Sequence, residues 1–422
     1  MPRRFAAACL VMLALVGCGP TSVAPTTGPT PAPTATPAGP TPAPTSTPDP
    51  AAIYAAIAAQ VEQIRGLRPT KSVAPVLIDE AQLRANLTRE FDQENPPALV
   101  EASQDELIEL GLLPAGTSLR QAELDLQAGQ VAGYYSPGAG QLFVVSRSGA
   151  VGPTQRVTYA HEFTHQLQDQ NFDLARLGFD TPDQGDRSLA RLALVEGDAV
   201  TTQTIWTRDN LSTADLAQLL ADASDPAALA ALERAPAFLR TTVLFPYTGG
   251  QAFVASLVAN GGEAAVDAAF RDPPDSTAQV LHPDLYLHHV APVAVNLPAH
   301  IAAALGAGWH ELATDTLGEL QLRTWLEADA VDTKTAEAAA DGWAGDRLAI
   351  LAGPNGQLAL AIRVRWTTAA DATAFVAAAT TALQKAPVGS GHAVGTASSS
   401  TTDVVVAPDS ALAQRLLAAL GH

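Results

Sequence analysis

The spacing of hydrophobic residues changes along the chain and predicts its secondary structure. After residue 50, apolar side chains recur at helical spacing over residues 51–67, 79–93 and 99–112, which favours three helices. Proline residues separate these segments, and proline does not continue a helix. We therefore expect a small helical preface over residues 51–115.

The pattern changes at residue 131, where two short apolar runs flank a cluster of turn residues. Residues 131–135 and 141–146 are apolar, and Ser-Pro-Gly-Ala-Gly lies between them, which predicts a β-hairpin. A helix is expected next, from residue 153 or 154 to residue 170, because proline and threonine both favour a helix start. A second long helix is expected over roughly residues 186–209.

The remaining patterns complete the prediction of an α+β, mostly helical fold. Further helices are expected over residues 213–222, 226–233, 249–260, 262–270, 317–326, 369–384 and 410–420. Strands are expected over residues 347–351, 358–366 and 402–406. We therefore predict one domain over residues 116–295, with a small β-hairpin or sheet among its helices, followed by a small α+β C-terminal module over residues 296–422.

The first 50 residues have a different character. Two arginines precede an apolar run over residues 5–16, which is the pattern of a signal peptide covering residues 1–17. The run ends in Leu-Val-Gly-Cys18, which resembles the lipobox of bacterial lipoproteins, so Cys18 is the expected lipidation site. An ordinary signal peptide is the alternative. Residues 18–50 then form a Pro/Thr-rich stalk, which predicts an anchor on the extracytoplasmic face of a bacterial membrane.

Charge and cysteine content narrow the classes of function. The formal net charge is -19, from 24 basic and 43 acidic side chains, and such a chain repels the phosphates of nucleic acids. We therefore expect no nucleic-acid partner. The two cysteines, Cys9 and Cys18, both precede residue 19, so no disulfide can stabilise the remainder of the chain.

A candidate metal site lies in the helix expected after the hairpin. His161-Glu-Phe-Thr-His165 is an HExxH motif, and residues four apart share one helical face, so both imidazoles can bind one metal ion. Glu162 is then placed to act as the general base toward a zinc-bound water. The alternative interpretation is a surface helix that carries two solvated histidines.

A catalytic zinc ion needs a third protein ligand and an open fourth position. Glu196 is the best candidate, because it lies on the second long helix among apolar residues, where an unpaired carboxylate is costly. Asp198 is its rival, and it could instead orient a ligand histidine. Asp169 follows His165 by one turn, and we expect it to support the site or to lie on the helix surface.

A donor for the oxyanion of the transition state is also required. His282, within Leu281-His-Pro283, is the preferred candidate, and Tyr247, within Phe245-Pro-Tyr, is its rival. A histidine or tyrosine beside proline often serves packing or a turn, so a structural role is the alternative for both residues.

These motifs resemble a known family of enzymes. The HExxH motif followed by Val195-Glu-Gly-Asp-Ala199 is similar to the gluzincin, or thermolysin-like, metallopeptidases, and more closely to bacterial lipid-anchored proteins of the peptidase MA-like kind. Softer similarities to that bacterial set lie in residues 133–137, 276–283 and 342–347. The resemblance implies one catalytic zinc ion held by His161, His165 and Glu196, with Glu162 as the base.

The resemblance also implies a function and shows one departure. It implies that strand 141–146 is a sheet edge that aligns a peptide substrate by strand addition. Thermolysin-like enzymes place an aspartate four residues after the ligand glutamate, where this chain has Val200. We expect a membrane-anchored zinc peptidase that acts on a peptide or protein substrate. The alternatives are a catalytically silent lipoprotein that binds a partner, and a zinc hydrolase of non-peptide bonds.

Overall fold

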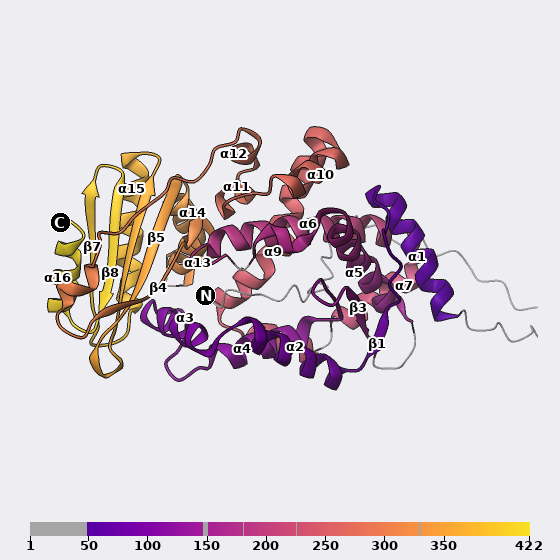
Figure 1. Ribbon diagram of the computed structural model, residues 1–422, viewed down its shortest axis with the longest axis horizontal. Helices are drawn as coiled ribbons and strands as arrows, with labels where there is room; N and C mark the ends of the chain where they lie inside the picture. Colours follow the sequence, from indigo (N-terminus) through magenta and orange to yellow (C-terminus); the bar gives the residue numbers. More distant parts are fainter. Residues whose placement is uncertain (1–48, 147–150, 180, 225, 329–330) are drawn as a thin grey trace, which may run out of the picture.

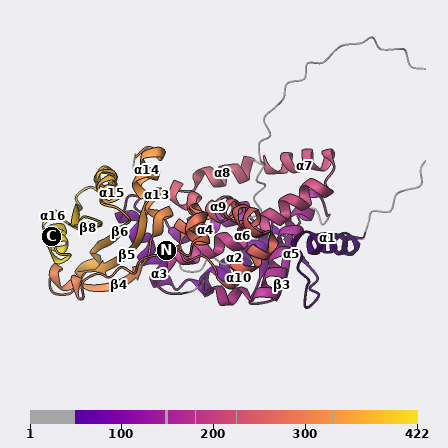
Figure 2. The same ribbon diagram turned by 90° about the horizontal axis from the view of Figure 1, so that it is seen from above.

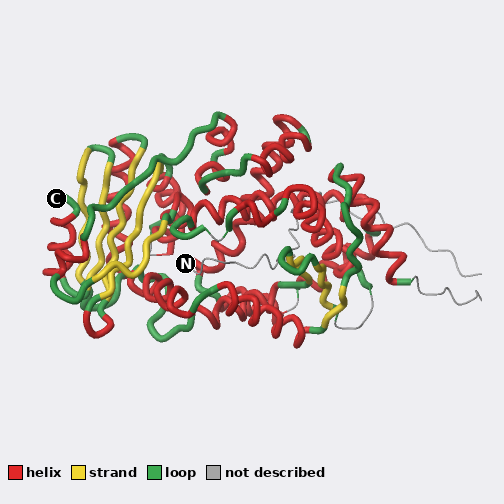
Figure 3. The backbone as a smooth tube through the Cα atoms, in the orientation of Figure 1, coloured by secondary structure: helices red, strands yellow, loops and turns green. Residues whose placement is uncertain are grey.

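A computed structural model describes residues 49–146, 151–179, 181–224, 226–328 and 331–422 of the chain. Its fold is α+β and mostly helical, as predicted, with two β-sheets at opposite ends of the molecule and helices between them (Figure 3). The predicted lipidation site at Cys18 and nearly all of the predicted stalk lie outside the described residues.

The N-terminal region contains a small sheet surrounded by helices. Its elements are α1 (Pro50–Arg65), β1 (Val76–Ile78), α2 (Glu80–Glu94), α3 (Pro97–Glu109), α4 (Leu119–Gln130), β2 (Gly133–Ser136) and β3 (Gln141–Val145). Strands β2 and β3 form the predicted antiparallel hairpin. Strand β1 pairs with β3 in parallel, and the strand order is β1-β3-β2.

The three-stranded sheet differs from the prediction in two ways, in its edge strands and in its use of a strand from the predicted helical preface. Strand β3 lies between β1 and β2, so it is not the sheet edge that the resemblance implied, and the edges are β1 and β2. The added strand β1 comes from the segment expected to be a separate helical preface. Helix α1 of that segment packs against the helix that follows the hairpin, through Tyr54 and Tyr159 among others. The preface is therefore part of the same packed unit as the predicted site.

Long helices occupy the centre of the molecule (Figure 1). They and the shorter helices beside them are α5 (Pro153–Phe172), α6 (Gly185–Asn210), α7 (Thr213–Ala223), α8 (Pro226–Arg234), α9 (Ala237–Gly261), α10 (Glu263–Arg271), α11 (Thr277–Leu281) and α12 (Pro283–Leu287). Helix α6 packs against α5 and α9. Helices α7 and α8 lie along one side of this group, against α5 and α4 respectively (Figure 2).

Helix α9 is longer than predicted, because it begins before Pro246 and continues through it. The packing of buried residues such as Phe238 and Phe253 outweighs the backbone hydrogen bond that proline removes. Within the described part of the chain, α9 is also the helix that is long and apolar enough to cross a membrane, but half of its most apolar window is buried inside the protein. In this structure α9 is a core helix.

The C-terminal module is a five-stranded antiparallel sheet covered by helices on both faces. Its elements are a 3-10 turn (Ile301–Leu305), β4 (His310–Asp315), α13 (Gly318–Ala328), α14 (Thr333–Ala340), β5 (Trp343–Ala352), β6 (Leu358–Trp366), α15 (Ala369–Ala382), β7 (Gly391–Ser398), β8 (Thr401–Ala407) and α16 (Ser410–Ala419). The strand order is β4-β5-β6-β8-β7. Strands β5, β6 and β8 were predicted, whereas the outer strands β4 and β7 were not.

Alternation along the central strands divides the core of this module. On β5, Ile350 packs with Trp325 and Phe375 of α13 and α15, while Leu351 faces the opposite side with Leu416 of α16. Helix α3 from the N-terminal region joins the first of these cores, where the indole Nε1 of Trp325 donates a hydrogen bond to the carbonyl of Leu110. The module is therefore packed against the helical region rather than tethered to it.

Candidate metal centre

Helix α5 brings the two motif histidines together. Pro153 occupies its first turn and the helix continues through residue 172, so residues 161 and 165 lie on one face. The Nε2 atoms of His161 and His165 are 3.0 Å apart, and both side chains are buried. The alternative of two solvated histidines on a surface helix is therefore wrong.

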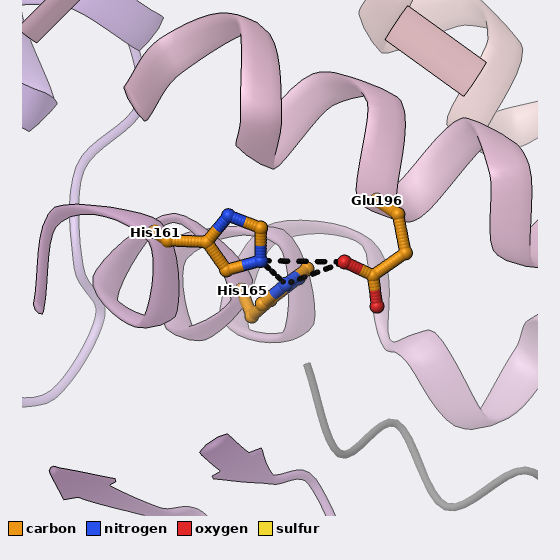
Figure 4. A group of neighbouring side chains, drawn as sticks. All are labelled: His161, His165 and Glu196. Carbon is orange, nitrogen blue, oxygen red and sulfur yellow. Dashed lines mark hydrogen bonds and ion pairs between the residues drawn. The ribbon is translucent and has the colours of Figure 1, made fainter. Parts of the chain in front are cut away.

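Helix α6 supplies the predicted carboxylate. The Oε2 atom of Glu196 lies 3.3 Å from Nε2 of His161 and 3.4 Å from Nε2 of His165, as Figure 4 shows. Three ligands of a tetrahedral zinc ion, each about 2.0–2.2 Å from the metal, lie roughly 3.3 Å from one another. The three donor atoms therefore already have the spacing that a tetrahedral ion requires.

Close contact between α6 and α9 fixes the position of Glu196. Gly197 follows it and meets the backbone of Gly250, because a Cβ added at Gly197 would lie 2.2 Å from the carbonyl carbon and oxygen of Gly250. A Cβ added at Gly250 would in turn lie 2.1 Å from the carbonyl oxygen of Ala193. Only glycine permits this approach, so the Glu-Gly pair in the sequence anchors the backbone of the third ligand.

The electrostatics of the three residues favour a positive charge between them. Burial opposes ionisation of Glu196, but the attraction of His165 and hydrogen bonds to both histidines lower its pKa to about 2. Burial lowers the pKa of His161, so its ring is neutral and keeps a lone pair for a metal. A carboxylate and a neutral imidazole at these distances are suitable zinc ligands.

Glu162 is buried and lies on the side of α5 that faces the small sheet. A Cβ added at Gly133 on β2 would lie 2.5 Å from Cγ2 of Thr158 and 3.5 Å from Cγ of Glu162. Gly133 therefore lets β2 run directly against this side of α5. The carboxylate of Glu162 is not part of the three-residue group, as expected for a base rather than a ligand.

The histidine ligands have a support that the sequence did not reveal. The Nδ1 atom of His165 lies 2.8 Å from Oε1 of Gln168, and Nε2 of Gln168 donates to Oδ2 of Asp198 at 2.8 Å. Asp198 was predicted as a rival ligand or as an orienting group, and it acts on the histidine only through Gln168. Arg65 of α1 forms an ion pair with the same carboxylate of Asp198. No sequence pattern connects Arg65 with this site.

Asp169 has a different role from the one considered for the metal site. Its carboxylate accepts hydrogen bonds from the hydroxyl of Tyr135 and from the backbone N–H of Leu174. These contacts join β2 and the following turn to the end of α5. The expectation that Asp169 supports a ligand histidine is therefore replaced by a structural role.

The two candidates for the oxyanion donor are separated by the structure. The ring of Tyr247 lies 6.4 Å from the ring of His161, so this residue of α9 is beside the candidate metal centre. His282 instead places its Nε2 atom 2.7 Å from Oε1 of Glu319 and 3.8 Å from Oδ1 of Asp341. His282 is thus bound within a second group of residues, and its role as the oxyanion donor stays a prediction.

The group around His282 is better described as a hydrogen-bonded ion pair than as a metal site. Its nitrogen-to-oxygen distance of 2.7 Å suits a hydrogen bond, and that bond raises the pKa of His282. Asp341 is largely exposed, and the nearby Arg323 disfavours a further positive charge. Among the described residues, the donors with zinc-like spacing are therefore His161, His165 and Glu196.

Comparisons with known proteins concern the other end of the molecule. A family model described as a domain of unknown function, DUF8575, matches residues 303–418. This segment contains the five-stranded sheet and its covering helices, and it excludes all three candidate ligands. No curated protein and no solved structure matches the chain.

Proposed function

We propose that this chain is a zinc-dependent peptidase of the gluzincin type, anchored through Cys18 at the extracytoplasmic face of a bacterial membrane. The observation that carries the proposal is the group of three donor atoms, two imidazole nitrogens and one carboxylate oxygen, at 3.0, 3.3 and 3.4 Å from one another. The anchor is supported by the sequence pattern that ends at Cys18.

The donor set favours zinc over harder cations. Two imidazoles with one carboxylate form a typical catalytic zinc site, whereas magnesium and calcium prefer oxygen ligands alone. Zinc bound at such a site acts as a Lewis acid and makes water a nucleophile near neutral pH. His161, His165 and Glu196 would hold the ion and leave its fourth position for water or substrate.

Glu162 is assigned the proton transfers. This assignment is supported by its position next to His161 on α5, by its burial and by its exclusion from the three-residue ligand group. In this role it accepts a proton from the attacking water and passes it to the amine of the leaving group. Tyr247, beside His161, replaces His282 as the donor that we assign to the oxyanion.

Substrate alignment is assigned to β2 rather than β3. Strand β2 is an edge of the three-stranded sheet, and its Gly133 lies against Thr158 and Glu162 of α5. An extended peptide that adds to this edge would place its backbone close to the base. A catalytically silent binding protein would have no use for a buried carboxylate at position 162, and this argues for an enzyme.

Substitution of Glu162 by glutamine tests the proposal. Because glutamine keeps the shape and cannot accept the proton, Glu162→Gln in the full-length chain is expected to retain one zinc ion and to lose about 10²–10⁴-fold in peptide hydrolysis. Zinc would be measured by metal analysis and hydrolysis with a peptide library, with Glu101→Gln on an exposed position of α3 as the control. Wild-type protein that binds no zinc, or a Glu162→Gln variant with full activity, would refute the proposal.

A further inference from the structure

We infer that Gln168, Asp198 and Arg65 form a relay of hydrogen bonds and ion pairs that positions His165 and makes α1 part of the metal centre. The inference rests on the proposed zinc site and goes beyond it, because none of these three residues is a ligand. The relay offers a support for a ligand histidine in a chain that has Val200 where thermolysin-like enzymes carry an aspartate.

The amide of Gln168 has its orientation determined by its neighbours. Its nitrogen lies 2.8 Å from Oδ2 of Asp198 and 3.0 Å from the carbonyl oxygen of Val195, and both of these atoms only accept. The amide oxygen must therefore face Nδ1 of His165, which lies 2.8 Å away. This oxygen accepts the proton on Nδ1, so Nε2, the atom that faces His161 and Glu196, is the nitrogen of His165 that would bind a metal.

Asp198 connects Gln168 to the N-terminal helix α1. It is buried, and a buried carboxylate needs a cationic partner. The Nε atom of Arg65 lies 2.7 Å from Oδ1 and 2.9 Å from Oδ2 of this carboxylate. The other nitrogens of Arg65 lie 2.8 Å from Asp267 and 3.3 Å from Glu263, both on α10.

Arg65 is the last residue of α1 and is only 1% exposed. Its three acidic neighbours come from α6 and α10, so one guanidinium joins three helices. Without α1, Asp198 would remain buried among carboxylates, and the amide of Gln168 would lose its fixed partner. Helix α1 is therefore an integral support of the centre.

Zinc affinity of the metal-stripped full-length chain tests the relay directly. Gln168→Leu keeps all three ligands and is expected to bind zinc about 10–100-fold more weakly, measured by competition with a chromophoric chelator. Gln166→Leu is the matched control, because Gln166 is equally buried on α5 but lies near the carbonyl of Lys71. The control is expected to bind zinc within about twofold of wild type. The visible spectrum of bound cobalt should change in Gln168→Leu alone.

Substitution at the far end of the relay separates positioning from general destabilisation. Arg65→Met is expected to weaken zinc binding in the same direction, and the double variant with Gln168→Leu should bind no more weakly than the weaker single variant. If Arg65→Met does not fold, Asp198→Asn is used instead, because it interrupts the relay without leaving a buried unpaired carboxylate. The same weakening of zinc binding is expected.

The outcomes distinguish this inference from the proposed function. Wild-type protein that binds one zinc ion, with Gln168→Leu equal to it in affinity and cobalt spectrum, would overturn the relay and leave the peptidase proposal intact. Effects of the two substitutions that multiply in the double variant would also overturn it. Wild-type protein that binds no zinc would overturn both.

Discussion

Two carboxylates of helix α6, Glu196 and Asp186, are equally buried, but their pKa values are shifted in opposite directions. Each is 1% exposed. Between two imidazoles, the pKa of Glu196 falls to about 2. At the start of the same helix, burial raises the pKa of Asp186 well above its usual value, and the nearby carboxylates Asp346 and Glu319 add to the shift. The partners, and not the depth of burial, therefore decide which acid is charged.

Asp186 lies where the helical region meets the C-terminal module. One of its oxygens accepts hydrogen bonds from the backbone and the hydroxyl of Thr277, and Oδ2 has no partner among the described residues. Its backbone N–H donates to the carbonyl of Thr316 in the loop before α13. Asp346 on β5 holds the same loop through the N–H groups of Leu317 and Gly318. Among the described residues, N–H and hydroxyl groups therefore hold Asp186 and Asp346 at this junction.

The largest effect is expected at Glu196, the carboxylate that lies between two imidazoles. Glu196→Gln replaces a charged zinc ligand with a neutral amide and should lower zinc affinity on the order of 10³-fold, measured by chelator competition. Glu233→Gln, on an exposed position of α8, is the control and should leave the affinity unchanged. If Glu196→Gln bound zinc as tightly as wild type, Glu196 would not be a zinc ligand.

A smaller effect, a gain in stability, is expected at Asp186, the carboxylate that lies near other acids. Asp186→Asn removes a charge that neighbouring acids disfavour and should raise the free energy of unfolding by about 1–2 kcal/mol at pH 8, measured by urea denaturation. Asp284→Asn, on the exposed side of α12, should change it by less than about 0.5 kcal/mol. Destabilisation by Asp186→Asn at pH 8 would show that the charged form is the one that the junction requires.

The pH dependence of stability follows from the same raised pKa values. Asp346 has a pKa of about 6, raised from 3.8 by burial and by Asp315. An acid with a raised pKa binds more protons in the folded state, so its contribution to stability is complete below about pH 4 and is lost as the pH rises through 6. Unfolding free energy should therefore fall by about 1–3 kcal/mol from pH 4 to 7 through this group. The Asp186→Asn variant should show a shallower fall than wild type, and a steeper one would contradict the assignment.

The smallest effect is expected at the third acid considered for the site. Asp169→Asn leaves an oxygen to accept from Tyr135 or Leu174 and should cost about 1 kcal/mol or less in stability. Zinc affinity should remain within about twofold of wild type, because no ligand histidine contacts Asp169. A tenfold loss of affinity would return this residue to the metal centre.

The three candidate ligands could be predicted because each belongs to a pattern that can be recognised locally in the sequence. The spacing of His161 and His165 places them on one helical face, and an acid among apolar residues pointed to Glu196. Gln168 and Arg65 belong to no such pattern. A glutamine on a polar stretch of helix looks like a solvated residue, and an arginine at a helix end looks like a favourable charge near the C-terminal carbonyls. Their roles depend on contacts that only the folded chain creates.

The fold was predictable to the same degree and for the same reason. The central strands β5, β6 and β8 each contain a short apolar run, such as residues 348–352, 358–362 and 404–407. The first three residues of β4 are exposed and β7 is rich in small residues, so neither of these two strands has a strong pattern. The first half of α9 was missed because Pro246 indicates a break, and tertiary packing overrides it. Strand β1 is only three residues long and gains its regularity from pairing with β3.

The ion pairs of Arg65 also determine when the centre can be completed during synthesis. Arg65 is made early, but its partners at Asp198 and Asp267 follow it by more than a hundred residues. A chain that grows at roughly 5–20 residues per second needs on the order of ten seconds or more to reach them. Until α6 has emerged, the guanidinium of Arg65 lacks Asp198, and until α10 has emerged it also lacks Asp267 and Glu263. The nascent chain therefore carries the histidines, the glutamate and Asp198 before α10 can complete the ion pairs of Arg65.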